Sequence, residues 1–248
     1  MRSLFWCSAA VLLAGCGGAH RVPDPFAYAR SAPLAIHDEG LVATSAWGTI
    51  RALSFAGVGG SRVEAYVVAP RARGRYPAAL YLHGSGGTRF DLVGEAAVLA
   101  RRGAVTMTIT YPSDTETYRP IVVDARRALD LLDARADVDP KRIGVFGFSL
   151  GGQIAAILAG DDPRPVSVGI AGGRGTDVTL YWVRRAHARL FFQAGTHDPV
   201  VPHGQLLALM RAAPGHPRVR WYAIGHELTP ALDRDQADFQ AAALGIGR

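Results

Sequence analysis

A serine lies at the centre of a glycine-flanked pentapeptide, Gly147-Phe148-Ser149-Leu150-Gly151. Residues 143–148 form a short apolar run that predicts a buried strand, and residues 153–160 have apolar positions at helical spacing. A serine at the sharp turn between a strand and a helix is presented for nucleophilic attack, in the arrangement called a nucleophile elbow. Glycines suit that turn, because side chains there would collide with the adjoining strand and helix. The pattern also arises by chance in a glycine-rich chain, so its surroundings must separate a catalytic serine from an incidental one.

The chain also offers an acid and a base in the order that such a serine needs. A serine hydroxyl becomes nucleophilic when a base removes its proton, and an acid orients that base and stabilises its charge. The apolar runs 190–194 and 218–224 predict strands, with Asp198 just beyond the first and His226 just beyond the second. Functional groups of open α/β sheets gather at the carboxyl ends of the strands. We therefore predict a triad of Ser149, Asp198 and His226.

Other histidines fit the role of base less well. His197 and His203 share the loop of Asp198, which restricts their reach toward the serine. His216 lies in a turn before the last predicted strand, at the opposite edge of the sheet, and His83 precedes the serine in the chain. For Asp198 the alternative role is structural, either capping the helix that follows or shaping its turn.

An acyl-transfer site also needs N–H donors for the charge that develops on the carbonyl oxygen. The backbone N–H of Leu150, the residue after the serine, is one natural donor. The second is expected from the glycine-rich loop His83-Gly84-Ser85-Gly86-Gly87, with the Ser85 N–H preferred and Gly84 as the alternative. This loop lacks the lysine and the spacing of phosphate-binding loops, and the chain has no His-Glu-x-x-His or thiolate-pair motif. No cofactor and no metal are expected.

Together these residues resemble the α/β-hydrolase superfamily over about residues 49–246. The stretch from Asp137 to Gly144 resembles the dienelactone-hydrolase-like and prolyl-oligopeptidase-like branches. Dienelactone hydrolases proper use a cysteine nucleophile where Ser149 stands, so their lactone substrate is not carried over. The resemblance implies a carboxylesterase that cleaves a small-molecule ester through an acyl-enzyme. The alternatives are a peptidase or acyltransferase with the same triad, and a non-catalytic binding lipoprotein of the same fold.

The elements around these residues predict one α/β domain. Two facing runs, 49–55 and 62–69, predict an antiparallel hairpin, after which strands and helices alternate. We expect an α/β-hydrolase fold: a mainly parallel twisted sheet, an N-terminal antiparallel hairpin and helices on both faces. Only residues 172–188 separate two of the later strands, which leaves room for a minimal cap and implies an open site. Aromatic residues near that site, expected to contact substrate, are Tyr111, Tyr118 and Trp182.

The N-terminal residues predict export. Arg2 is followed by an apolar run, 4–14, that is too short to span a bilayer. The tetrapeptide Leu13-Ala14-Gly15-Cys16 resembles the lipobox of bacterial lipoproteins, whose cysteine carries lipid. We expect a signal peptide at 1–15, a tether at 16–40 and the hydrolase domain at 41–248. The resemblance implies a protein anchored by Cys16 to a bacterial membrane, on the periplasmic or cell-surface side; the alternative is a plain secretory signal.

The formal net charge of +6 does not indicate nucleic-acid binding. Lys141 is the only lysine, so nearly all the basic residues are arginines, and these are scattered along the chain rather than grouped. No aromatic residues alternate with them as they do on a single-strand binding surface. The expected partners are an ester substrate and a membrane, and the sequence carries no indication of an oligomeric state.

Overall fold

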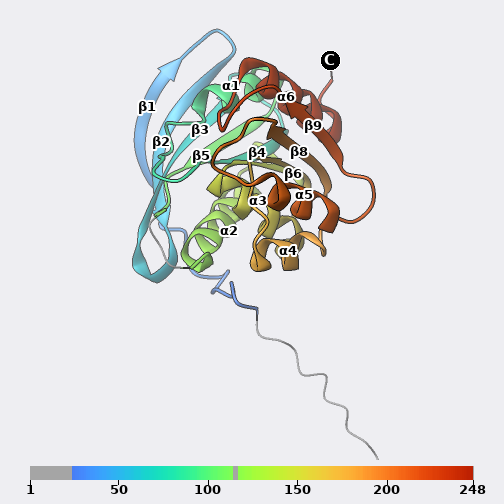
Figure 1. Cartoon of the computed structure of the whole chain (residues 1–248). Coiled ribbons are helices and arrows are strands. Elements are labelled where there is room, and N and C mark those ends of the chain that lie inside the picture. Colours follow the sequence, from blue (N-terminus) through green and yellow to red (C-terminus); the bar gives the residue numbers. More distant parts are fainter. Residues whose placement is uncertain (1–23, 114–116, 248) are drawn as a thin grey trace, which may run out of the picture.

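The structure is a computed structural model of the chain, and it describes residues 24–113 and 117–247. Across these residues one sheet runs in the order β1-β2-β3-β5-β4-β6-β7-β8-β9 (Figure 1). Its strands are β1 (His37–Thr44), β2 (Gly48–Ala56), β3 (Arg62–Pro70), β4 (Tyr76–Leu82), β5 (Val105–Ile109), β6 (Val138–Phe148), β7 (Pro165–Ala171), β8 (Arg189–Gly195) and β9 (Arg218–Tyr222).

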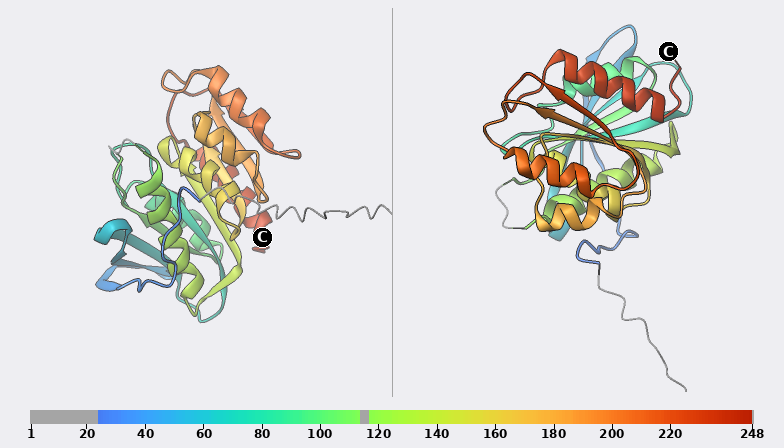
Figure 2. Two further views of the ribbon diagram at one scale, coloured as in Figure 1. Left: turned by 90° about the horizontal axis from the view of Figure 1, so that it is seen from below. Right: turned by 45° about the vertical axis from the view of Figure 1, so that its right-hand side comes forward.

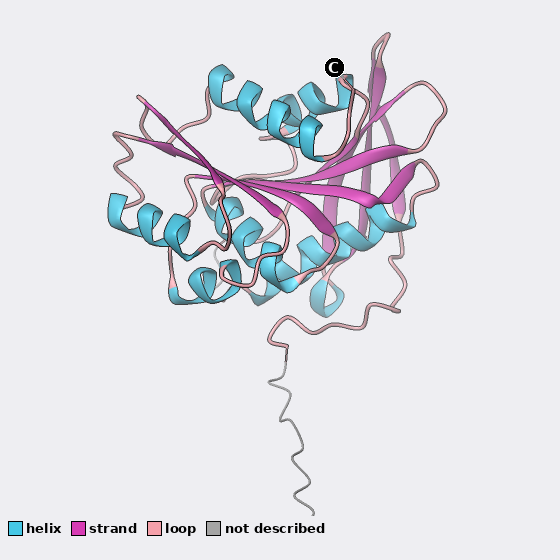
Figure 3. Cartoon of the chain, turned by 90° about the vertical axis from the view of Figure 1, so that its right-hand side faces the viewer, coloured by secondary structure: helices cyan, strands magenta, loops and turns pink. Residues whose placement is uncertain are grey.

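Helices cover both faces of this sheet. Two of them, α1 and α6, pack on one face, and the other four lie on the opposite side (Figure 3). Figure 2 shows the same two helical layers from further directions. The helices are α1 (Val93–Arg101), α2 (Arg119–Ala134), α3 (Leu150–Asp161), α4 (Asp177–Val183), α5 (His203–Ala212) and α6 (Pro230–Ala243).

Antiparallel pairing is confined to the N-terminal side of the sheet. Strands β1, β2 and β3 pair antiparallel in sequence order, and β3 pairs antiparallel with β5. From β5 to β9 every neighbouring pair is parallel. The chain is therefore an α/β-hydrolase fold with an antiparallel start, as predicted. Because β4 to β9 are parallel, their carboxyl ends meet at one edge, where the predicted acid, base and nucleophile all lie.

The centre of the fold is the β6–α3 unit. Residues 143–147 of β6 are buried, with other strands on both sides. Helix α3 is apolar nearly all round, and Ile154 through Ala159 are buried in it. A helix with this composition must be covered on all sides, and α3 is: it lies against the sheet, α2 and α4. The nucleophile elbow thus lies between a buried strand and a buried helix.

The segment expected as a tether extends less far than predicted. Of residues 16–40, those described here, 24–40, lie on the domain, and the last four belong to β1. Phe26 is 4% exposed and packs against Trp182 at a ring-centroid distance of 5.7 Å. The Tyr28 hydroxyl donates to Asp130 at 2.9 Å, and Asp24 pairs with Arg126 at 3.0 Å. The domain therefore begins before residue 41, the boundary set from composition. The predicted signal peptide and Cys16 lie outside the described residues.

Candidate active site

Strand β6 and helix α3 meet at Ser149, whose backbone has φ 55° and ψ −115°. A positive φ is rare for a residue with a side chain and stores strain that the surrounding structure must hold. The Ser149 N–H donates to the Ala171 carbonyl at 2.8 Å, which fixes the turn to the neighbouring strand β7. A Cβ at Gly147 would overlap the Gly151 carbonyl, and one at Gly151 would overlap the Leu82 carbonyl. Both glycines are therefore required for the steric reason that the sequence indicated.

The structure brings the three predicted side chains together. Ser149 Oγ lies 2.8 Å from His226 Nε2, and His226 Nδ1 lies 2.7 Å from Asp198 Oδ2. Ser149 belongs to the elbow, Asp198 follows β8, and His226 follows β9. The Asp198 side chain is 3% exposed and that of His226 13%. A hydrogen-bonded chain from carboxylate to imidazole to hydroxyl thus connects the carboxyl ends of β8, β9 and β6, and β7 lies between β6 and β8 in the sheet.

Asp198 is held as a carboxylate. Burial acts to raise its pKa, but the hydrogen bond with His226 and the backbone N–H groups of Val201 and Val200 outweigh it, so the pKa lies below its ordinary value. The two backbone N–H groups donate to Oδ1 at 2.8 Å from Val200 and 2.9 Å from Val201. They leave Oδ2 for His226. The turn-shaping role that the sequence left open and the contact with the histidine therefore belong to different oxygens of one carboxylate.

The predicted N–H donors lie on either side of the serine. Within residues 24–113 and 117–247, the N–H of Leu150, which opens α3, and the N–H of Ser85 have no hydrogen-bond acceptor. The loop of Ser85 passes close to the nucleophile, since a Cβ at Gly84 would lie 3.3 Å from the Ser149 Cβ. Gly86 N–H donates to Ser113 Oγ at 2.8 Å, which ties the loop to the chain after β5. Two free N–H groups beside a nucleophile can hold an oxyanion.

Tyr111 is not on the surface of this site, contrary to the prediction. It is 3% exposed, and its ring stacks on His83 at a centroid distance of 3.9 Å and an interplanar angle of 10°. Its hydroxyl donates to the His83 carbonyl, which also accepts the Gly151 N–H at 2.9 Å. Burial lowers the pKa of His83, and its Nδ1 lies 2.6 Å from the Gly84 carbonyl. Tyr111 and His83 therefore hold the Ser85 loop from beneath.

Two further contacts of the histidine escaped sequence analysis. The Phe148 ring lies 5.1 Å from the His226 ring between centroids, at an interplanar angle of 34°. Gly172, with φ 57°, passes so close that a Cβ there would lie 3.1 Å from His226 Cε1. The position of Phe148 directly before the nucleophile was a signal for the first contact. Nothing in the sequence indicated the second, because it depends on where the chain goes after β7.

The remaining predicted aromatic residues lie beside the triad rather than in it. Tyr118 donates to Gln153 Oε1 at 2.5 Å, and Gln153 is one helical turn beyond Ser149. Trp182 belongs to α4 and packs on Phe26. Both line an open hollow of about 860 Å³ whose lining includes no triad residue. Of the competing histidines, His203 stacks on Trp221. His216 is exposed and lies near the first residues of β8, at the opposite end of that strand from Asp198.

No group of three or more potential metal-ligating side chains is present across residues 24–113 and 117–247. Over the same ranges, none of the helices has both the length and the apolar character needed to cross a bilayer.

Comparison with known proteins identifies the family. The sequence pattern of the dienelactone hydrolase family matches residues 98–245, which is more than half of the chain and includes the nucleophile elbow, Asp198 and His226. The chain belongs to the dienelactone hydrolase family. This agrees with the branch that the residues before the elbow resembled.

Two individual proteins also match parts of the chain. NocK of Nocardia uniformis subsp. tsuyamanensis, whose name proposes an esterase, is 31% identical over 171 residues, or 60% of this chain and 50% of NocK. The α/β-hydrolase domain-containing protein WAV2 of Arabidopsis thaliana is 47% identical over 57 residues, or 23% of this chain and 17% of WAV2. The chain thus spans half or less of the length of these relatives.

Among solved structures, the acetyl xylan esterase from Paenibacillus sp. R4 superimposes with a TM-score of 0.75. The superposition covers 85% of this dienelactone hydrolase family member and 89% of the esterase, at 21% sequence identity. At that identity the likeness concerns the fold, and it agrees with the α/β-hydrolase architecture described above.

Proposed function

We propose that this member of the dienelactone hydrolase family is a serine carboxylesterase, with Ser149 as nucleophile. The observation that carries the proposal is the hydrogen-bonded chain from Asp198 through His226 to Ser149, with its 2.7 Å and 2.8 Å contacts. Nucleophile, base and orienting acid lie within hydrogen-bond reach in the order that acyl transfer requires. The names of the relatives agree with ester hydrolysis.

The geometry assigns a role to each group in the first half of the reaction. Ser149 Oγ attacks the ester carbonyl carbon while His226 Nε2 accepts the hydroxyl proton. The carbonyl oxygen becomes an oxyanion, which the N–H groups of Leu150 and Ser85 stabilise. Asp198 holds the imidazole by Nδ1 and stabilises its positive charge. The tetrahedral intermediate collapses as His226 Nε2 returns the proton to the leaving alcohol oxygen, and the acyl group stays on Ser149.

The second half uses the same groups with water in place of the hydroxyl. His226 Nε2 takes a proton from a water molecule, whose oxygen attacks the acyl carbon, and the oxyanion forms again at the same two N–H groups. Collapse releases the carboxylic acid and returns the proton to Ser149 Oγ. The connection between β7 and β8 contains only the short helix α4, so no large cap covers the site. This openness suits a small ester substrate arriving from solvent.

Labelling with a fluorophosphonate tests the nucleophile. The wild-type chain is expected to bind the probe covalently at Ser149, as located by mass spectrometry of tryptic peptides, and Ser149→Ala is expected not to. Ser61→Ala is a control, because Ser61 is an exposed serine directly before β3 and has no role in the proposed reaction. Folded wild-type protein that remains unlabelled would refute the proposal and favour a binding protein of the same fold.

The class of acyl bond is tested separately. Rates with 4-nitrophenyl esters and with the corresponding amino-acyl anilides distinguish an esterase from a peptidase that uses the same residues. We expect hydrolysis of the esters and none of the anilides. Comparable rates on both would replace the esterase with a peptidase, and faster transfer of the acyl group to an added alcohol than to water would indicate an acyltransferase.

We also propose that the protein is exported and anchored to a bacterial membrane by lipid on Cys16. The support is the resemblance of residues 13–16 to a lipobox. When the full-length chain is expressed in a bacterium, it is expected to enter the detergent phase of Triton X-114, and Cys16→Ser is expected to leave it. Equal partitioning of the two proteins would show that Cys16 carries no anchor.

A further inference from the structure

A hollow among the described residues lies between three separate parts of the fold. It has a volume of about 860 Å³ and is bounded by residues 24–26, by residues 117–119 at the start of α2, and by helix α4. Pockets that bind drug-sized molecules have similar volumes, roughly 300–1,000 Å³. The proposed hydrolytic reaction uses none of its lining residues, so its purpose is unassigned.

The walls of the hollow are mainly aromatic and aliphatic. Phe26 and Trp182 pack together at 5.7 Å, and Tyr181 meets Trp182 edge-on at 5.1 Å. Tyr181 is 43% exposed and Val178 37%, both large fractions for apolar side chains. An exposed, concave cluster of this kind favours a binding role over simple packing.

The main polar groups of the lining are occupied by the protein itself. The Arg119 guanidinium donates to the backbone carbonyls of Pro25 and, at 2.7 Å, of Ala27. The Tyr118 hydroxyl is engaged by Gln153. Carboxylates from Asp24 and Asp177 complete the lining. A sugar would need many free donors and acceptors, and this surface offers few. An apolar occupant fits it better.

The hollow is connected to the nucleophile through one turn of α3. Tyr118, on its wall, bonds to Gln153, and the Gln153 N–H donates to the Ser149 carbonyl at 3.1 Å. Tyr118 Oη also lies 3.4 Å from Thr176 Oγ1. Thr176 is the last residue of a short stretch that begins at Gly172, and Gly172 lies beside the His226 ring. Two hydrogen-bonded side chains, Tyr118 and Gln153, therefore connect the wall of the hollow to the helical turn that follows Ser149.

We propose that this hollow binds an extended apolar group, aliphatic or aryl, of the ester substrate. The inference rests on the proposed hydrolase function, which it deepens by naming the substrate class. The apolar group can belong to the acyl side or to the alcohol side of the ester, since both leave the same carbonyl at Ser149. The chemistry of recognition is the same for the two sides: burial of hydrocarbon against the rings of Trp182 and Tyr181.

Two substrate series distinguish the sides. In the first, 4-nitrophenyl esters carry acyl chains from acetyl to octanoyl, and in the second, acetate esters carry alcohols from ethyl to octyl. With roughly half of each added methylene buried, kcat/KM is expected to rise about 50-fold over six methylenes in one of the series. A wild-type enzyme that labels at Ser149 but shows flat rates in both series, or that prefers acetylated xylo-oligosaccharides, would overturn the proposal.

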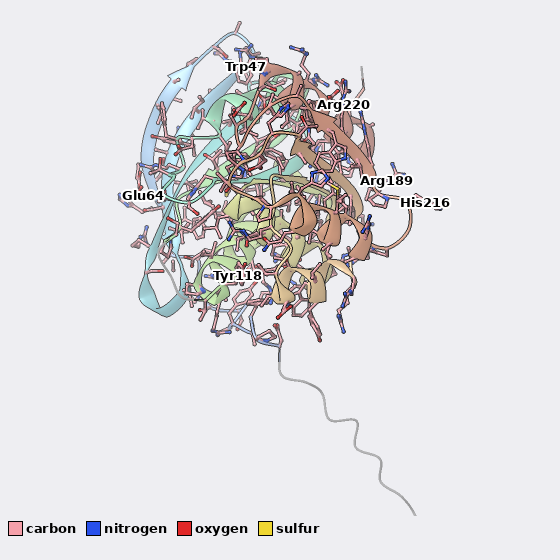
Figure 4. The ribbon with its side chains drawn as sticks, viewed as in Figure 1. Trp47, Glu64, Tyr118, Arg189, His216 and Arg220 are labelled. Atoms are coloured by element: carbon pink, nitrogen blue, oxygen red, sulfur yellow. The ribbon has the colours of Figure 1, made fainter. Side chains whose placement is uncertain are left out.

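Variants of the wall connect any chain-length preference to the hollow. Trp182→Ala is expected to reduce the 50-fold rise in kcat/KM along the series to about fivefold. Tyr181→Ala, at a more exposed position, is a second variant in case the first is unstable. Trp47→Ala is the control, because Trp47 is a half-buried tryptophan at the opposite end of the molecule from Tyr118 (Figure 4). If kcat/KM rises with chain length as steeply in both wall variants as in the wild type, the hollow does not bind the apolar group.

A binding measurement separates failure of the hollow from failure of the proposed chemistry. The neutral fluorescent probe N-phenyl-1-naphthylamine is titrated into Ser149→Ala protein. This binding measurement does not require a functioning triad. Binding is expected, and adding Trp182→Ala is expected to weaken it about tenfold. Binding without Ser149 labelling would leave the hollow as an apolar ligand site and overturn the hydrolase, whereas labelling without any probe binding would overturn the hollow alone.

Discussion

Replacing Asp198 by asparagine tests the proposed reaction most sharply, because the structure dictates how the amide must sit. Val200 and Val201 donate two N–H groups to Oδ1, so that position needs an acceptor. The asparagine oxygen therefore takes it, and the NH₂ group faces His226 Nδ1. Nδ1 must then accept, which moves the imidazole proton to Nε2. A protonated Nε2 cannot take the proton of Ser149.

The size of the effect follows from this change of tautomer. An enzyme that must populate the unfavourable tautomer loses about 10⁴-fold in kcat, or about 5.4 kcal/mol of transition-state stabilisation. The fold should survive, since the asparagine satisfies the same backbone donors. The assay is kcat/KM with 4-nitrophenyl acetate, alongside thermal unfolding and fluorophosphonate labelling. Asp198→Ala is the comparison, because it leaves the ring free to choose its tautomer, and Asp139→Asn is a control at a remote surface ion pair.

The result that refutes the reasoning is specific. If Asp198→Asn keeps more than about a tenth of the wild-type kcat/KM, the carboxylate does not set the histidine tautomer and its role is to shape the turn. If Asp139→Asn loses activity to the same extent, the loss does not come from the triad.

Three further expectations concern the surroundings of the triad. Ser85→Pro, which removes one backbone N–H, is expected to lower kcat by about 10²–10³-fold, while Ser85→Ala, which keeps it, stays near wild type. Equal activities of these two variants would exclude the Ser85 N–H as a donor to the oxyanion. Tyr111→Phe is expected to lower the free energy of unfolding by about 1 kcal/mol, because it removes a buried hydrogen bond. The substrate preference is expected to stay the same, because the ring is buried on His83. An altered substrate preference would mean that Tyr111 contacts the substrate. Asp124 is buried and accepts a hydrogen bond from the Val58 N–H at 2.8 Å, and burial raises its pKa to about 6. Between about pH 4 and pH 6 the folded state therefore binds more protons than the unfolded state, so the free energy of unfolding falls as pH rises through this range. Asp124→Asn should therefore be more stable than wild type at pH 7, by on the order of 2–3 kcal/mol, and equal to it below pH 4 in denaturant titrations; a difference independent of pH would contradict this.

The sequence was sufficient to predict that Ser149, Asp198 and His226 meet at one edge of the sheet, because each lies just beyond an apolar run. Strand β8 precedes Asp198, strand β9 precedes His226, and β6 leads into Ser149. Parallel strands bring their carboxyl ends to one edge, so three positions far apart in the chain become neighbours once the alternation of elements is known. The steric need for Gly147 and Gly151 followed from the sharpness of the turn.

Other parts of the prediction failed for physical reasons that single-sequence patterns do not carry. Tyr111 follows a strand at the correct edge, but its sequence position does not reveal that its ring turns inward onto His83. Residues 24–36 are rich in proline and lack periodicity, which is typical of a linker. They are nevertheless held by partners a hundred residues away, such as Asp130 for Tyr28. Contacts at that separation leave no local pattern.

The position of Asp24 at the rim of the hollow also sets a length scale. If Cys16 carries lipid, seven residues lie between it and Asp24, so eight residue-to-residue steps connect the two. However those residues are arranged, they can span no more than about 28 Å. Asp24, which lines the hollow, would then stay within about 28 Å of the lipid anchor. An ester dissolved in that membrane would reach the enzyme by diffusion along a surface, and its supply would depend on how strongly it partitions into lipid rather than on its concentration in the surrounding fluid.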